Sequence, residues 1–155
     1  MDVTNFNQLI SWTRQVHQQL ATLLEQDAHL HHNERARLLL ACLSEQQQRL
    51  GDTIKKFEES TKTQALDAYI PYLYSAFEQR PINTQRLYTQ SYAELTIAEI
   101  SQVLFDAHQQ MIDFYQHLVN ESQVPEAKEL VESLLALEQA AQKQMASHFE
   151  GIEDI

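Results

Sequence analysis

Hydrophobic residues recur every three or four positions along four stretches of the chain, which is the spacing of a helix that buries one face. In the first stretch these residues are Phe6, Leu9, Ile10, Val16, Leu20, Leu23 and Leu24. We expect Thr4 or Asn5 to cap this helix and Asn33 to cap the next, because their side chains accept hydrogen bonds from free backbone N–H groups. The pattern predicts helices over residues of about 5–27, 34–59, 96–120 and 125–150.

The segment 60–95 between the second and third helices has a different character. It contains Pro71, Pro81 and five of the six tyrosines (Tyr69, Tyr72, Tyr74, Tyr88 and Tyr92). We interpret it as a connection with a short helix at about 64–78. Two hairpins with tight loops, joined by about 35 residues, are typical of a four-helix bundle with one long crossover. The tyrosines are expected to cover the flank of this bundle, the alternative being a ligand pocket or a dimer contact.

Composition supports an all-α chain. Its 155 residues include only two Gly and three Pro, whereas average usage would give about 18 of the two together. This shortage of turn residues excludes β-sandwiches and Gly-rich nucleotide-binding folds. We predict one helical domain over 1–155, in which Gly51 weakens the second helix without ending it, Pro125 opens the last helix and Gly151 closes it.

The net charge of −11 argues against nucleic acid and anionic membranes as partners, because both are bound by clusters of Lys and Arg. The chain contains no apolar run of the roughly 18 residues that a membrane span requires, and its N-terminus does not resemble a secretory signal. We therefore expect a cytoplasmic protein. The apolar surroundings of Cys42 are those of a small core residue rather than a reactive thiol.

The two predicted hairpins resemble each other in sequence. His17-Gln-Gln-Leu corresponds to His108-Gln-Gln-Met at an offset of 91 residues, and Leu-Ser-Glu45-Gln corresponds to Ala-Leu-Glu138-Gln at an offset of 93. We assign the difference of two residues to the hairpin loops. The duplication indicates that the four polar residues occupy related places in the two halves.

These four polar residues fall on or beside the inward-facing rows of their helices. His17 follows Ile10 and precedes Leu24 in one row, and His108 lies between Leu104 and Met111 in another. Glu45 and Glu138 are placed on or beside the core in the same way. A buried carboxylate is costly unless it is paired, ligated or protonated, so two of them require an explanation.

Part of the sequence resembles the rubrerythrin type of the ferritin-like superfamily. The resemblance covers roughly residues 96–150 and rests on three stretches: Asp113-Phe-Tyr-Gln-His-Leu118, Val124-Pro-Glu-Ala-Lys-Glu-Leu130 and Leu134-Leu-Ala-Leu-Glu138. It implies a ferritin-like bundle with the crossover between the second and third helices. For residues 5–59 the likeness rests mostly on the internal repeat.

The resemblance also implies a metal site, because this family holds two irons with four Glu and two His. Carried over residue by residue, the corresponding positions hold His17, Glu45, His108 and Glu138, while the two motif histidines are replaced by Gln48 and Ala141. Two carboxylates cannot neutralise two divalent ions, so a di-iron centre is disfavoured. One Zn, Fe or Mn ion with two His and two Glu would be neutral.

Three functions follow as hypotheses. The first is a non-catalytic bundle in which two buried His–Glu pairs are relics of a lost di-iron site. The second is a protein that binds one divalent metal ion through the four named residues, and the third is a di-iron oxidase or peroxidase. We interpret the loop histidines His29, His31 and His32 as solvated, and a homodimer is expected by analogy alone.

Overall fold

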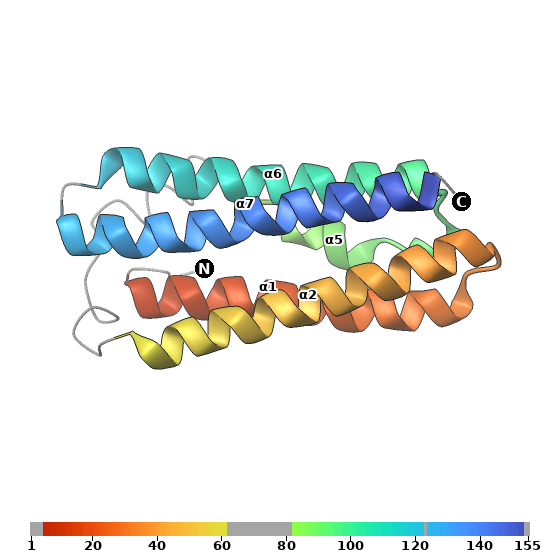
Figure 1. Ribbon diagram of the computed structural model, residues 1–155, viewed down its shortest axis with the longest axis horizontal. Helices are drawn as coiled ribbons and strands as arrows, with labels where there is room; N and C mark the ends of the chain where they lie inside the picture. The colour runs from red at the N-terminus through yellow and green to blue at the C-terminus, as the bar shows by residue number, and fades with distance from the viewer. Residues whose placement is uncertain (1–4, 62–81, 123, 154–155) are drawn as a thin grey trace.

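The computed structural model describes residues 5–61, 82–122 and 124–153, and these ranges are helical with no strand among them. The elements are α1 (Phe6–Leu30), α2 (Glu34–Ser60), α5 (Thr84–Thr89), the 3-10 turn η1 (Tyr92–Glu94), α6 (Ile97–Glu121) and α7 (Pro125–Glu153). The all-α prediction is confirmed. The four long helices lie side by side as two antiparallel hairpins, α1 with α2 and α6 with α7 (Figure 1).

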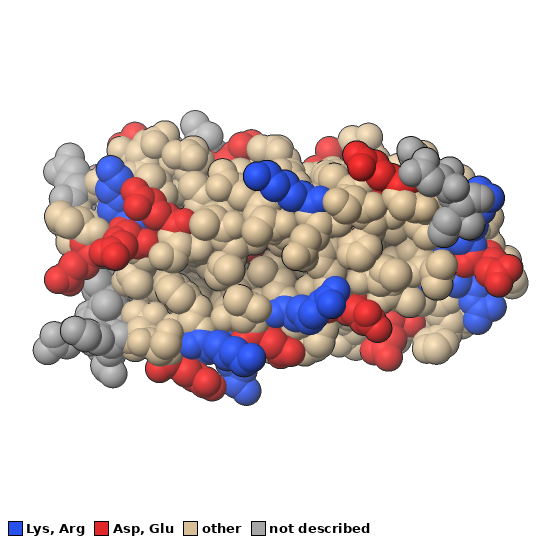
Figure 2. All heavy atoms as spheres, viewed as in Figure 1, with Lys and Arg blue, Asp and Glu red and all other residues tan. Residues whose placement is uncertain are grey.

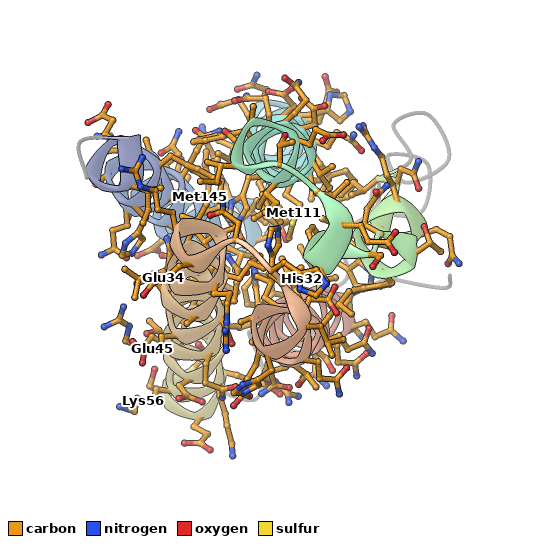
Figure 3. All side chains as sticks on the ribbon, turned by 90° about the vertical axis from the view of Figure 1, so that its right-hand side faces the viewer. His32, Glu34, Glu45, Lys56, Met111 and Met145 are labelled. Atoms are coloured by element: carbon orange, nitrogen blue, oxygen red, sulfur yellow. The ribbon has the colours of Figure 1, made fainter. Side chains whose placement is uncertain are left out.

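The two hairpins meet along α2 and α7, and the short elements α5 and η1 occupy the opposite side of the molecule. There α5 packs against both α1 and α6, and η1 packs against α1 (Figure 3). Helices α2 and α6 run in the same direction, so the chain has to return along the molecule between them (Figure 1). The short helix predicted at 64–78 lies outside the described residues, and α5 and η1 were not predicted.

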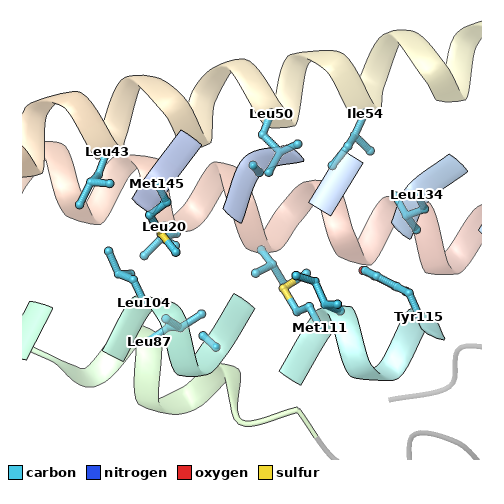
Figure 4. Close-up of a cluster of buried hydrophobic side chains, with 14 of the residues drawn as sticks. Leu20, Leu43, Leu50, Ile54, Leu87, Leu104, Met111, Tyr115, Leu134 and Met145 are labelled. Carbon is cyan, nitrogen blue, oxygen red and sulfur yellow. The ribbon is translucent and has the colours of Figure 1, made fainter. Parts of the chain in front are cut away.

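The hairpins repeat at a constant offset of 91 residues. The first loop separates α1, ending at Leu30, from α2, beginning at Glu34, and the second separates α6, ending at Glu121, from α7, beginning at Pro125. Buried positions keep the same offset, as in the pairs Leu9 and Ile100, Leu20 and Met111, Leu43 and Leu134, and Ile54 and Met145. The offset of 93 between the second and fourth helices was therefore wrong, because the two loops have equal length. Figure 4 shows part of the shared core.

Local capping places the helix starts where the sequence predicts them. The Asn5 side chain accepts a hydrogen bond from the backbone N–H of Gln8, and Asn33 accepts one from that of Ala36. Pro125 is the first residue of α7, as predicted. Gly51 lies inside α2, where an added Cβ would come within 3.1 Å of the Gln18 side chain, so the glycine permits close contact with α1.

Two helix ends were predicted wrongly. Helix α7 continues past Gly151 to Glu153 because Ile152, only 6% exposed, still packs in the core. Helix α1 continues through Asp27 to Leu30. Asp27 is buried at its end, where its Oδ2 accepts a hydrogen bond from the backbone N–H of Tyr92 at 2.8 Å.

Asp27→Ala is expected to lower the free energy of unfolding by about 1–3 kcal/mol, because it leaves the buried N–H of Tyr92 without an acceptor. Urea denaturation measures this loss, and hydrogen exchange should show earlier opening of the Tyr92 amide. Asp52→Ala is the matched control, since Asp52 is exposed. Equal stability of the two variants would contradict the anchoring role of Asp27.

Candidate metal centre

Four polar side chains, one from each long helix, meet in the middle of the bundle. They are His17 of α1, Gln47 of α2, His108 of α6 and Glu138 of α7, and their exposed fractions are 1%, 1%, 2% and 0%. Positions 17 and 108, like positions 47 and 138, are related by the 91-residue repeat. We call these four residues the core network.

The core network closes on itself. Glu138 Oε1 lies 2.6 Å from His17 Nε2, and Gln47 Oε1 lies 2.6 Å from His17 Nδ1. Gln47 Nε2 lies 3.4 Å from His108 Nε2, and His108 Nδ1 lies 3.5 Å from Glu138 Oε2. Each side chain therefore touches two of the others, and Glu138 faces both histidines.

Burial and the single carboxylate set the protonation of the network. Burial disfavours a charged His17, but the nearby Glu138 carboxylate outweighs it and raises the pKa of His17 above 6.5. Burial likewise opposes ionisation of Glu138, but His17 outweighs it and lowers the Glu138 pKa below 4.5. Burial lowers the pKa of His108 to about 4 despite Glu138. These shifts favour an ion pair of a His17 imidazolium and the Glu138 carboxylate, beside a neutral His108.

These charge states fix the direction of the hydrogen bonds. His17 donates from Nε2 to Glu138 and from Nδ1 to the Gln47 carbonyl oxygen, and the Gln47 amide then donates to His108 Nε2. The proton of neutral His108 is left on Nδ1. Neither His108 Nδ1 nor Glu138 Oε2 has a hydrogen-bond partner, although both atoms are buried.

This unpartnered pair of atoms fits a metal ion. Two ligand atoms about 2.1 Å from one tetrahedral ion lie about 3.4 Å apart, and His108 Nδ1 lies 3.5 Å from Glu138 Oε2. Ligand atoms of His17, His108 and Glu138 all lie within 4.8 Å of one another. A buried group of two His and one Glu could therefore bind one metal ion, with Gln47 beside it.

Glu45, the fourth predicted ligand, is not part of this group. It is exposed on the outer side of α2 (Figure 3), so the expectation that it faces the core is wrong. Leu38, which lies two helical turns before Glu45 on the same face of α2, is 54% exposed. The inward row of α2 instead contains Leu43, Gln47 and Leu50.

Gln47 was not predicted from the sequence, because an uncharged amide is not a typical metal ligand. Two features of the sequence could have identified it. It lies three residues before Leu50 and four after Leu43, and it precedes Glu138 by the same 91 residues that separate His17 from His108. The sequence predicted two separate His–Glu pairs. The structure instead has one carboxylate, that of Glu138, which faces both histidines.

The remaining candidate residues take structural places. His31 accepts a hydrogen bond at Nδ1 from the backbone N–H of Asn33, so its Nε2 donates to the Leu95 carbonyl, which ties the first loop to the segment before α6. His29 and His32 are exposed. Tyr92 is completely buried and donates from its hydroxyl to the Leu87 carbonyl. Tyr69, Tyr72 and Tyr74 lie outside the described residues.

Comparison with known proteins gave no match: no protein-family model matches the chain, and no curated protein and no solved structure matches it. None of the described helices combines the length and the apolar character that crossing a membrane requires.

Proposed function

We propose that this protein is a ferritin-like helical bundle that binds a single divalent transition-metal ion in its core. The ligands are His17, His108 and Glu138, and Zn²⁺ fits this set best, ahead of Fe²⁺ and Mn²⁺. The observation that carries the proposal is the facing pair His108 Nδ1 and Glu138 Oε2, both buried and both without a hydrogen-bond partner. Such atoms are rare in folded proteins unless an ion or water satisfies them.

The ferritin-like fold is supported by the arrangement of the four long helices. Two antiparallel hairpins repeat at a constant offset, and α2 and α6 run in the same direction, as a bundle with one long crossover requires (Figure 1). A di-iron centre finds no support among the described residues, because the core network holds one carboxylate where two irons need about four.

Metal binding would change the protonation and the net charge of the core network. The metal-free network is neutral, with one imidazolium and one carboxylate. Ligation by His17 requires loss of its Nε2 proton, and ligation by His108 requires its proton to move from Nδ1 to Nε2, where the Gln47 oxygen would have to accept it. Two neutral imidazoles with one carboxylate then leave the loaded site with one positive charge. Glu45, the second predicted carboxylate, lies on the surface and cannot neutralise this positive charge. A Zn²⁺ ion with three protein ligands keeps one position open and lowers the pKa of water bound there.

A second candidate function is a non-catalytic scaffold, and the 2.6 Å contact between His17 and Glu138 favours it. This pair neutralises itself without any ion. The metal-free network would then be a permanent polar cluster that fixes the register of the four helices.

Metal analysis separates the two functions. Protein prepared without a His tag should bind one equivalent of Zn²⁺, measured by calorimetry and by metal content after dialysis. His17→Ala, His108→Ala and Glu138→Ala should each remove this binding, whereas Glu45→Ala and His29→Ala should keep it. Less than about a tenth of an equivalent, with Zn²⁺, Fe²⁺ and Mn²⁺ alike, would leave the scaffold as the function.

The affinity for Zn²⁺ should rise with pH. Since one proton leaves His17 when the ion binds, and the pKa of His17 is raised above 6.5, each pH unit below that pKa should weaken binding about tenfold. Calorimetry in buffers of different ionisation enthalpy would count the released proton. Release of no proton at pH 6 would contradict ligation by His17.

A further inference from the structure

A groove of about 560 Å³ lies between α2 and α7, next to the core network. Its lining includes Gln46, Arg49 and Leu50 of α2 and Leu137, Ala140 and Ala141 of α7. On α2, residues 46 and 50 flank Gln47, and on α7, residues 137 and 141 flank Glu138. The groove therefore lies at the level of the core network. We call it the α2–α7 groove.

The two halves of the repeat differ in side-chain size along this groove. Where α2 carries Arg49 and Leu50, α7 carries Ala140 and Ala141, 91 residues later. At these repeat-related positions α2 has two large side chains and α7 has two methyl groups. The small side chains of α7 leave room for a hollow beside α2. The strip between these helices carries few charged side chains (Figure 2).

The side chain of Gln46 closes the floor of the groove. It starts on α2 and reaches α7, where its Nε2 donates a hydrogen bond to the Ala141 carbonyl at 2.6 Å. Gln46 is only 2% exposed, and its Oε1 is buried without a partner. A buried acceptor without a partner costs free energy. If the amide turned outward, Oε1 would gain a water partner in exchange for the bond to the Ala141 carbonyl.

On the other side of the bundle the network is covered by a further layer. There α5 packs against α1 and α6 and closes the space between them (Figure 3). The α2–α7 groove lies on the side of the bundle that α5 leaves uncovered, and the Gln46 side chain bridges the two helices there.

We propose that a divalent metal ion reaches the core network through the α2–α7 groove and that Gln46 is the gate at its floor. This inference rests on the proposed metal site. Arg49 is exposed at the groove, and its charge opposes an approaching cation. The gate and this charge act on the rate of metal uptake, whereas the three ligands determine the affinity.

Stopped-flow mixing of metal-free protein with Co²⁺, followed by the visible absorption of the bound ion, tests the route. Ala140→Trp fills the groove and should slow uptake at least tenfold, with one equivalent still bound at equilibrium. Ala136→Trp is the matched control, because Ala136 is exposed on α7 outside the groove lining. Gln46→Ala should speed uptake, with Gln48→Ala as its control, and Arg49→Gln should speed it at low salt only.

A second measurement uses no metal. Exchange of the His17 ring N–H protons with D₂O, followed by NMR, should slow in Ala140→Trp and quicken in Gln46→Ala relative to the two controls. Stoichiometric Co²⁺ binding at rates and with exchange equal to the controls would overturn the route but keep the metal site. Failure of every protein to bind Co²⁺ would overturn the metal site, and the exchange rates would then decide whether the gate exists.

Discussion

Glu138→Ala is expected to lower the free energy of unfolding by about 3–5 kcal/mol, the largest effect of a single substitution that we predict for this chain. Glu138 is the one carboxylate in the core network, and its side chain is completely buried. Its removal takes away the counter-charge that keeps the buried His17 protonated and leaves His17 Nε2 without a partner. Urea denaturation at pH 7, with a chelator present, measures the loss.

Two further variants show that the loss comes from the network. Glu45→Ala removes the same side chain from an exposed place on α2 and should change stability by no more than about 0.5 kcal/mol. Glu138→Gln also removes the counter-charge, but it keeps the shape of the side chain and a hydrogen-bond partner for His17, so its stability should fall between those of the two alanine variants. A loss below about 1 kcal/mol in Glu138→Ala would contradict the buried ion pair.

The long helices were predictable because their causes are local. The spacing of apolar residues and the caps at Asn5 and Asn33 depend on neighbours within a few positions. The two wrong helix ends depend on distant contacts instead. The sequence around Asp27 is typical of a loop, but in the structure its carboxylate accepts a hydrogen bond from the N–H of Tyr92. Gly151 is typical of a helix end, but Ile152 beyond it packs in the core.

Three of the four predicted ligands meet in the structure, and the fourth failed for a geometric reason. A helix turns about 100° per residue, so the error of two residues in the α2 register rotates the position by about 200°. Glu45 therefore faces outward, and Gln47 takes the inward place that corresponds to Glu138. The offset of 91 residues relates both helix pairs and places Gln47, rather than Glu45, in register with Glu138.

The sequence could not show that the four side chains of the core network form a closed ring of contacts. Periodicity places His17, His108 and Glu138 on inward faces, but the distances between them depend on how far apart the helices pack. Those distances decide that Glu138 bonds to His17 at 2.6 Å and only approaches His108, at 3.5 Å. The same geometry makes one histidine an imidazolium and leaves the other neutral.

The opposite shifts of the two histidines predict a stability that peaks near pH 6.5 in metal-free protein. Folding lowers the pKa of His108 from 6.5 to about 4. Between these values the unfolded chain binds the extra proton, so His108 makes stability fall by about 3 kcal/mol from pH 6.5 to 4. Folding raises the pKa of His17 above 6.5. Its contribution is complete below 6.5 and is lost as the pH rises through the raised value.

His108→Gln and His17→Gln should therefore remove opposite limbs of the profile. Urea denaturation from pH 4 to 9, with a chelator present, gives the free energy of unfolding of each protein. In His108→Gln the rise of stability between pH 4 and 6.5 should be shallower than in the parent by up to about 1.4 kcal/mol per pH unit. His17→Gln should instead lose the decline above pH 6.5. The acidic side chains of the surface are common to all three proteins, so their effects cancel when the pH profiles of stability are compared. Parallel profiles would therefore mean that Glu138 does not make one histidine charged and leave the other neutral.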